Sequence, residues 1–244
     1  MSQADIIDDL YRAIVADLVE AGAASPYPAD ANEPDPRYLS YGVRAAGKKQ
    51  IISRHRPAVR ALDRDDRLRL AEQLISSGYG EQQSVGLAIL EPLADYFSPE
   101  RLDELDGLVR HLRGWSKVDE FSGSLVRDVL FNNPDALLPY VRRWNADDDR
   151  WLKRLSVVLF TRKVAATGRF TDVALDLCDN LAHDEEDLVR KGVGWSLKDL
   201  LKVDRDRVMA HVAALRADGA SGVVIRYAIK DLPAAERAAF LASS

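Results

Sequence analysis

Apolar residues recur along most of the chain at the spacing of three and four residues that places them on one face of an α-helix. The first such segment covers residues 2–22, where Ile6, Leu10, Ile14 and Leu18 share a face. There is almost no alternation of apolar and polar residues of the kind that marks a half-buried strand. The pattern therefore predicts an all-α fold.

Further helical segments follow at short intervals, and polar or Gly- and Pro-containing stretches separate them. Residues 23–36, rich in Ala, Pro, Asn and Asp, are predicted to form a loop or strap, and a basic helix follows Gly42. The later helices are expected at residues 64–78, 82–96, 99–112, 121–131, 135–144, 151–163, 171–180, 188–202, 204–216, 222–232 and 234–242.

Residues 142–163 and 178–202 are two copies of one pattern. Each copy has an apolar residue, an acidic loop, a basic pair and then a helix-length apolar run. Arg154 of the first copy matches Lys191 of the second, 37 residues later. This spacing is typical of stacked helical hairpins of the HEAT and armadillo type. The sequence therefore predicts a right-handed α-α superhelix, with about a dozen helices stacked in antiparallel pairs.

We expect one domain over residues 1–244, with a helix and strap in 1–36, repeats in 37–232 and a cap in 233–244. A hydrophobic content of 47% and a charged content of 30% indicate a globular chain. No apolar run is long enough to cross a bilayer, and a single cysteine fits a reducing compartment, so we expect a cytoplasmic protein.

No metal or cofactor is expected. The lone Cys178 excludes a cysteine-rich zinc site. The histidines do not show ligand spacing; they are His55, His111, His183 and His211.

The net charge of −5 argues against a nucleic-acid partner unless the basic residues gather on one face. The helix at residues 188–202 suggests such a face. Lys191, Trp195, Lys198 and Lys202 share one side, opposite an apolar stripe. Cations around a flat aromatic ring suit a sugar–phosphate backbone. From this helix alone the alternative is favoured, in which Trp195 packs under the next repeat and the lysines only confer solubility.

The helix at residues 151–163 strengthens the case for a polyanionic partner. Arg154 occupies the position of Lys191, and Arg162 and Lys163 lie at the far end. Because a solenoid presents equivalent faces of successive repeats on one concave side, these cations are expected to align. The acidic loops precede the helices, where carboxylates suit the helix dipole and leave the other face basic.

The stretch GWSKVDEF, residues 114–121, carries candidate chemistry. Trp115 and Asp119 are four residues apart and point the same way on a helix. A carboxylate beside an indole, among Arg113, Lys117 and Arg154, could stabilise a developing positive charge. The spacing supports at least as well the alternative of a buried Trp115, with Asp119 as the N-cap of a helix that starts two residues later.

Four segments between residues 38 and 202 together carry a resemblance: YLSYGVRAAGKKQ, GWSKVDEF, RWLKRLSVVLF and RKGVGWSLKDLLK. In this combination the sequence resembles the AlkD-type DNA alkylation repair glycosylases, which are built of HEAT-like repeats. The resemblance implies hydrolysis of the N-glycosidic bond of positively charged N3- and N7-alkylated purines in duplex DNA. It also implies base excision repair of 3-methyladenine and 7-methylguanine without a cofactor, with the damaged base left stacked. We expect a monomer, since a groove for duplex DNA needs only one subunit.

The resemblance also assigns residues. Asp119 would be the catalytic carboxylate that stabilises the oxocarbenium ion and orients water, and Trp115 would lie against the deoxyribose. Arg154 would hold the phosphate near the lesion, and Trp195 would be the second tryptophan there. The expected DNA-binding residues are Tyr38, Tyr41, Lys48, Lys49, Arg113, Lys117, Arg162, Lys163, Arg190, Lys191, Lys198 and Lys202.

The chain departs from the family pattern in three respects. Lys198 stands where the family often has Arg, which loses a bidentate grip on phosphate. Gly114 precedes Trp115 where the family has a second tryptophan, and the chain is acidic where active members tend to be basic.

Three hypotheses follow, in order of preference. The first is a glycosylase for alkylated purines. The second is a non-catalytic member of the same fold that binds damaged or branched DNA. The third is a HEAT-type scaffold that binds protein, which predicts an apolar rather than basic concave face.

Overall fold

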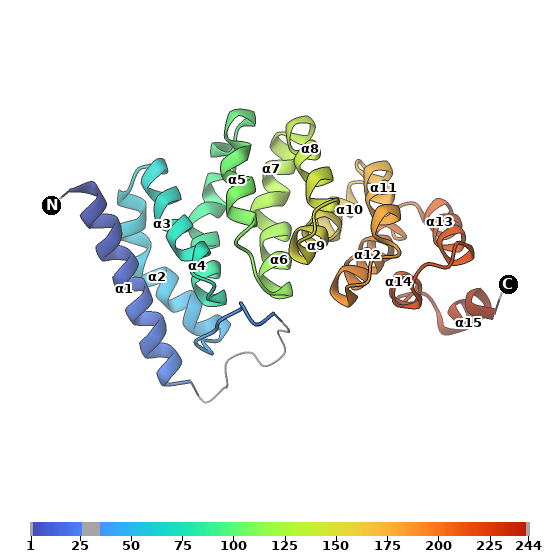
Figure 1. Cartoon of the computed structure of the whole chain (residues 1–244), viewed down its shortest axis with the longest axis horizontal. Helices are drawn as coiled ribbons and strands as arrows, with labels where there is room; N and C mark the ends of the chain where they lie inside the picture. The colour runs from blue at the N-terminus through green and yellow to red at the C-terminus, as the bar shows by residue number, and fades with distance from the viewer. Residues whose placement is uncertain (1, 26–34, 243–244) are drawn as a thin grey trace. The chain divides into compact units, whose positions relative to one another are not determined.

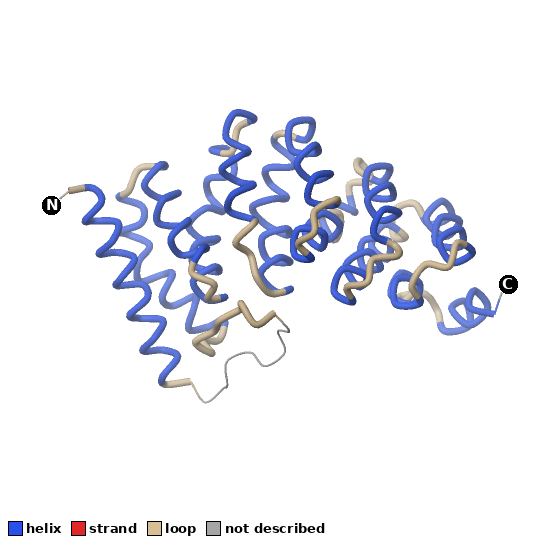
Figure 2. The backbone as a smooth tube through the Cα atoms, in the orientation of Figure 1, coloured by secondary structure: helices blue, strands red, loops and turns tan. Residues whose placement is uncertain are grey.

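The computed structural model describes residues 2–25 and 35–242, so most of the predicted strap, residues 26–34, lies outside the described residues. The described part is helical, and within it no strand forms (Figure 2). A single isolated bridge pairs Leu39 with Tyr79. The prediction of an all-α helical-repeat fold is confirmed. In the described ranges, no helix has both the length and the apolarity to cross a membrane.

The chain divides into two compact units, residues 1–137 and 138–244, which are described separately. The expected single domain and its boundaries stay a prediction. The elements that begin in the first unit are α1 Gln3–Ala23, α2 Ala45–Ala61, α3 Arg64–Ser76, α4 Gly80–Leu90, η1 Glu91–Tyr96, η2 Pro99–Arg101, α5 Leu102–Val109, α6 Trp115–Phe121, the π-turn η3 Ser122–Val126, α7 Arg127–Asn132 and α8 Pro134–Asn145 (Figure 1).

A buried carboxylate fixes the loop that carries the YLSYGV motif. Glu81, at the start of α4, is only 4% exposed. Its oxygens accept hydrogen bonds from the backbone N–H of Tyr41 at 3.2 Å, the backbone N–H of Val43 at 3.0 Å and the hydroxyl of Ser40 at 2.8 Å. The Tyr41 ring stacks on Tyr79, with ring centroids 4.2 Å apart. The loop is therefore held against α4 by paired polar groups, as buried backbone N–H groups require.

The second unit continues the hairpin pattern, and α12 packs against α9, α11 and α14. The apolar stripe predicted for α12 is confirmed: Val189, Val193, Leu197 and Leu200 are all buried. The remaining elements are α9 Arg150–Val158, α10 Arg162–Ala166, α11 Thr171–Leu181, α12 Asp187–Leu200, α13 Arg205–Ala217, α14 Gly222–Ala228 and α15 Ala234–Ala242.

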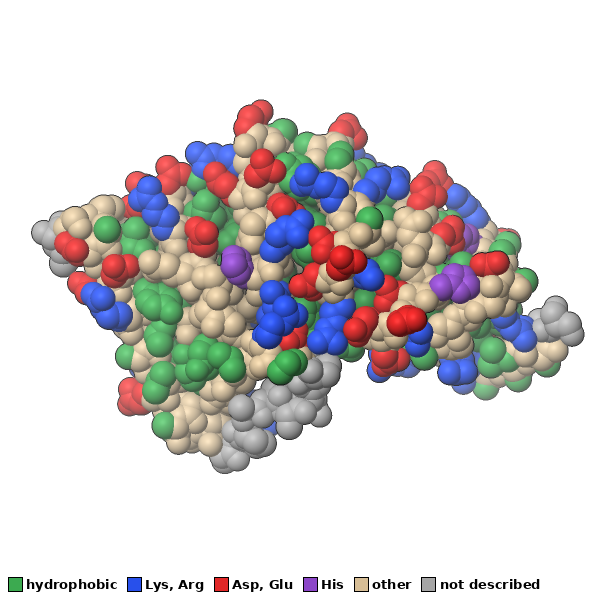
Figure 3. Space-filling model, in the orientation of Figure 1, with side chains coloured by type: hydrophobic (Ala, Val, Ile, Leu, Met, Phe, Trp, Pro, Cys, Tyr) green, Lys and Arg blue, Asp and Glu red, His purple; other side chains and the backbone are tan. Residues whose placement is uncertain are grey.

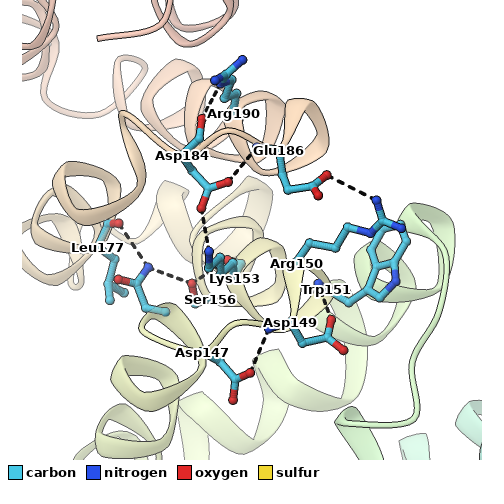
Figure 4. Close-up of polar contacts among 11 residues, drawn as sticks. Asp147, Asp149, Arg150, Trp151, Lys153, Ser156, Leu177, Asp184, Glu186 and Arg190 are labelled. Carbon is cyan, nitrogen blue, oxygen red and sulfur yellow. Dashed lines mark hydrogen bonds and ion pairs between the residues drawn. The ribbon is translucent and has the colours of Figure 1, made fainter. Parts of the chain in front are cut away.

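The acidic loops lie before α9 and α12, as expected, and they join the two hairpins (Figure 4). Asp149 caps α9, accepting a hydrogen bond from the backbone N–H of Trp151 at 2.7 Å. The Asp184 carboxylate accepts from Lys153 Nζ at 2.9 Å, and Glu186 pairs with Arg150 at 3.3 Å. The acids of one copy therefore bind the bases of the copy before it.

Two glycines in the GVGW sequence allow α12 to lie close to both neighbours. A β-carbon at Gly194 would lie 2.5 Å from Cβ of Tyr227 and 2.9 Å from the carbonyl oxygen of Val224, both on α14. A β-carbon at Gly192 would lie 3.2 Å from Cγ2 of Val157 on α9. The approach of α12 to α14 at Gly194 is therefore closer than its approach to α9 at Gly192.

Several helix boundaries differ from the sequence prediction; the helix expected over residues 82–96, for example, ends at Leu90 and is followed by the 3₁₀ turn η1. The helix expected to start at residue 121 starts at Trp115, because Gly114, with φ 86°, turns the chain directly into it. The helix expected over residues 151–163 ends at Val158, and Arg162 opens the separate helix α10 with φ 48°.

Replacement of Gly194 by alanine tests the close approach of α12 to α14. The added β-carbon overlaps backbone and a Cβ that cannot move independently, so we expect Gly194→Ala to lower the free energy of unfolding by about 1–3 kcal/mol. Gly107→Ala is the control, because a β-carbon there meets nothing within 4 Å, and it should raise stability by about 0.4–1 kcal/mol. Urea unfolding measures both. Equal effects of the two substitutions would contradict this account.

Candidate functional site

Trp115 and Asp119 lie one turn apart on α6 and therefore share a face of that helix. The Trp115 side chain is 40% exposed and Asp119 is half-buried. The alternative of a buried Trp115 with Asp119 as an N-cap is wrong, because Asp119 lies inside the helix and the indole reaches solvent.

The helix that carries this pair continues into an irregular turn. α6 runs through the π-turn Ser122–Val126 into α7. The Ser122 hydroxyl donates to the Asp119 carbonyl at 3.1 Å, and the Ser124 hydroxyl donates to the Glu120 carbonyl at 2.7 Å. π-turns inside helices are frequent at functional sites. Here the turn follows the carboxylate directly and its hydroxyls bind the carbonyls of α6.

A polar cluster on the other side of α6 attaches it to α4. Lys117 is 4% exposed; its Nζ donates to the Ser84 hydroxyl at 2.5 Å and pairs with Glu120. Lys48 Nζ also donates to Ser84, at 3.1 Å. Burial lowers the pKa of Lys48, and the charge of Lys117 lowers it further. Burial alone would raise the pKa of Glu120, but the charge and hydrogen bond of Lys117 outweigh it and the pKa is lowered.

The cluster changes the interpretation of Lys117. Its ammonium group is buried, so we leave it out of the proposed DNA-contacting surface. Ser84 and Glu120 were not predicted from the sequence; the spacing of three residues between Lys117 and Glu120 was the available signal.

The other cations and tyrosines predicted in the first unit have varied surroundings. Arg113 donates from Nη1 to the carbonyls of Arg110 at 2.8 Å and Leu112 at 2.6 Å, which completes the end of α5. Lys49 is exposed and, in the described part of the chain, pairs with no carboxylate. The Tyr38 ring lies against Gly80.

The second tyrosine predicted to bind DNA, Tyr41, is held in place by a hydrogen bond to its hydroxyl. That oxygen accepts a hydrogen bond from Gln82 Nε2 at 2.8 Å. Burial is the main cause of its raised pKa. Tyr41 is therefore part of the folded loop, and its role in binding DNA stays a prediction.

In the second unit, Trp195 is half-buried at the centre of a charged group. Its Nε1–H donates to Asp199 at 3.0 Å, and the Arg162 guanidinium lies 4.8 Å from the centroid of its ring. Lys198 pairs with Asp231 at 3.0 Å and Lys202 with Asp199 at 2.9 Å. These contacts are ion pairs of surface lysines, so the alternative in which the lysines only confer solubility stays open.

The other predicted cations named here, Arg154, Arg190 and Lys191, each contact a carbonyl or a carboxylate of the protein. Arg154 is buried, and its Nη1 donates to the Leu188 carbonyl at 2.5 Å. Arg190 donates to the Asp184 carbonyl, and Lys191 pairs with Asp187 at 2.6 Å. On the face drawn in Figure 3, Lys and Arg side chains are interspersed with Asp and Glu. Basic charge is therefore mixed with acidic charge on that face.

The structure brings Trp195, Arg162, Lys198 and Lys202 together around Asp199, a residue that sequence analysis missed. The spacing of four residues from Trp195 was its signal. Trp115 and Asp119 belong to the first unit, and their convergence with the residues of the second unit stays a prediction. Among the described residues, no group of His, Cys, Asp and Glu side chains is arranged to hold a metal ion.

Comparison with known proteins identifies the family. The model of a family described as DNA alkylation repair enzyme matches residues 36–232. The chain belongs to this DNA alkylation repair family. The resemblance seen in the sequence is thereby confirmed, and membership gives the chain a role in alkylation repair with DNA as the partner.

A solved structure supports the fold of this repair-family chain. A predicted DNA alkylation repair enzyme from Enterococcus faecalis aligns with a TM-score of 0.68 over 81% of this chain and 90% of that one, at 16% sequence identity. At this identity the likeness shows the fold alone. Among curated proteins, none matches the chain.

The Lys117–Glu120 pair predicts a pH-dependent effect. Because the pKa of Glu120 is lowered by folding, its contribution is present at neutral pH and is lost as the pH falls through the folded-state pKa, below 4.5. We expect Glu120→Gln to cost about 1–2 kcal/mol at pH 7, less than a fully buried pair since 38% of the Glu120 side chain is exposed. The stabilities of the variant and the native chain, measured by urea unfolding, should converge once the pH is below the lowered folded-state pKa of Glu120. Glu72→Gln, on the exposed side of α3, is the control; a gap that widens in acid would be the contrary result.

Proposed function

We propose that this repair-family chain is a DNA N-glycosylase for positively charged N3- and N7-alkylated purines in duplex DNA. Asp119 stabilises the oxocarbenium ion and orients the attacking water, and Trp115 lies against the deoxyribose. The observation that carries the proposal is the pair itself: a carboxylate and a 40%-exposed indole on one face of α6.

The chemistry needs only these groups. An alkylated purine already carries a positive charge and leaves readily, so its departure requires no acid. As the glycosidic bond breaks, positive charge develops on the sugar. A fixed carboxylate stabilises that charge electrostatically, and an indole face adds cation–π stabilisation. No metal or cofactor is part of this route.

Binding of the duplex is assigned to both units. Trp195 is proposed to lie at the lesion, whereas Arg154, buried and donating to the Leu188 carbonyl, is left out of the phosphate contacts on the same ground as Lys117. Lys49 and Lys163 are exposed and, among described side chains, pair with no acid, so they reach phosphate without losing a partner. Lys191 is proposed to release the exposed carboxylate of Asp187 and to bind a phosphate in its place.

Base release from methylated duplex DNA is the direct test. The purified chain should release 3-methyladenine and 7-methylguanine, and Asp119→Asn should slow release about 10²–10³-fold because it removes the fixed negative charge. Trp115→Ala should also slow release. Asp95→Asn, an exposed carboxylate paired with Arg64, should not. Chromatography of the freed bases under single turnover gives the rates.

The same preparation separates the alternatives. Binding to damaged duplex in a gel shift without base release would favour a non-catalytic damage-binding protein. Neither binding nor release at low salt would favour a protein-binding scaffold. Full activity of Asp119→Asn would remove Asp119 from the mechanism.

Phosphate contacts by the unpaired lysines predict a salt effect. Each of Lys49→Ala and Lys163→Ala should weaken binding to any duplex and lower the slope of log K against log salt by about one. Arg12→Gln, which removes an exposed cation already paired with Asp9, is the matched control and should leave the slope unchanged. Fluorescence anisotropy between low and physiological salt measures the slopes. An unchanged slope in the lysine variants would exclude them as phosphate contacts.

A further inference from the structure

Asp199 on α12 is a buried carboxylate that the proposed reaction does not use. It is 5% exposed, and both of its oxygens are occupied. Oδ2 accepts from Trp195 Nε1 at 3.0 Å and from the backbone N–H of Arg162 at 2.9 Å. Oδ1 accepts from Lys202 Nζ at 2.9 Å and lies 3.4 Å from Lys198 Nζ. One oxygen therefore holds an indole and a backbone group, and the other holds two ammonium groups.

The backbone group held by Oδ2 is in an uncommon conformation. Of the described residues other than glycine, Arg162 alone has a positive φ, 48°. A residue with a β-carbon stays in this region only when its surroundings hold it there, and such residues concentrate at functional sites. Here the Asp199 carboxylate, which accepts a hydrogen bond from the Arg162 N–H, helps to hold Arg162 in this conformation.

The turn at Arg162 has a consequence for its side chain. The guanidinium folds back over the Trp195 ring, 4.8 Å from its centroid. The edge of the same indole is fixed by Asp199. Asp199 Oδ2 thus orients the Trp195 ring through its Nε1–H and the turn that carries the Arg162 guanidinium through the Arg162 N–H.

We infer that Asp199 is a positioning residue that preassembles Trp195 and Arg162 into a rigid platform for the nucleotide at the lesion. This inference rests on the proposed function for the identity of what the platform contacts. The existence of the platform does not rest on it. Asp199 acts through the two side chains and contacts no substrate itself.

The chain supplies a matched acid for comparison. Asp231 pairs with the same two lysines, with Lys198 at 3.0 Å and with Lys202 at 3.8 Å, but its side chain is 51% exposed. Removing either acid takes one carboxylate away from the same two lysines and leaves them the other. Only the removal of Asp199 releases the indole and the Arg162 N–H.

The test compares Asp199→Ala, Asp199→Asn and Asp231→Ala. The asparagine carbonyl can still accept from Trp195 and Arg162, so it separates hydrogen bonding from charge. We expect Asp199→Ala to slow base release about tenfold or more under single turnover, Asp199→Asn to stay within about threefold, and Asp231→Ala to release base at the native rate. Equal losses in Asp199→Ala and Asp231→Ala, or no loss in Asp199→Ala, would overturn the inference.

A readout independent of catalysis accompanies the rates. In ¹H–¹⁵N spectra the Trp195 indole N–H and the Arg162 amide of the native chain should exchange slowly with solvent. Asp231→Ala should leave both resonances in place, and Asp199→Ala should shift the indole resonance, which Trp195→Phe assigns. Rapid exchange of both groups in the native chain would refute the platform even if Asp199→Ala fails to fold. If the native chain releases no base while both groups are protected, the proposed function fails and the platform remains.

Discussion

The close approach of α12 to both of its neighbours is the constraint on which the second unit depends. Gly192 faces α9 and Gly194 faces α14, where a β-carbon would lie 2.5 Å from Tyr227 Cβ. With these two sides covered, Trp195 and Asp199 occupy the side of α12 that α10 approaches. The packing of small residues thus determines where the aromatic ring and its carboxylate stand. The position of the Trp195–Asp199 hydrogen bond therefore depends on the close packing at Gly192 and Gly194.

The sequence Gly-Trp-Ser-x-x-Asp occurs twice, at residues 114–119 and 194–199, and the helix period directs the Trp and Asp of each copy to one face. Their surroundings differ. The first glycine, with φ 86°, begins α6, and its tryptophan is 40% exposed. The second lies within α12, and its aspartate, Asp199, is 5% exposed. Local sequence fixes the relative direction of the two side chains, whereas the neighbouring helices decide which pair meets solvent and which becomes a support.

Features set by local sequence could be predicted, whereas features set by contacts with distant parts of the chain could not. Helical periodicity located the apolar stripe of α12, because burial of one face repeats every three to four residues. The break before Arg162 was not predictable, since no Gly or Pro marks it and its partner Asp199 lies 37 residues later. Lys117 was among the residues predicted to bind DNA, but Ser84, 33 residues earlier, holds it in the interior. Contacts between distant positions leave no periodic signal in a single sequence.

Acidity and DNA binding are compatible in this chain because its acids differ in burial. Exposed ion pairs such as Lys191–Asp187 contribute about 0–1 kcal/mol each, so a phosphate replaces the carboxylate at little cost. A buried acid such as Asp199 cannot be exchanged in this way, since its donors would lose a partner away from water. Burial raises the pKa of Asp199, but the Arg162 N–H and the two lysines lower it overall, which keeps it charged at neutral pH. The net charge of −5 therefore combines exposed acids, which compete with DNA for the lysines, and buried acids such as Asp199, which hold the fold, and only the exposed acids oppose binding.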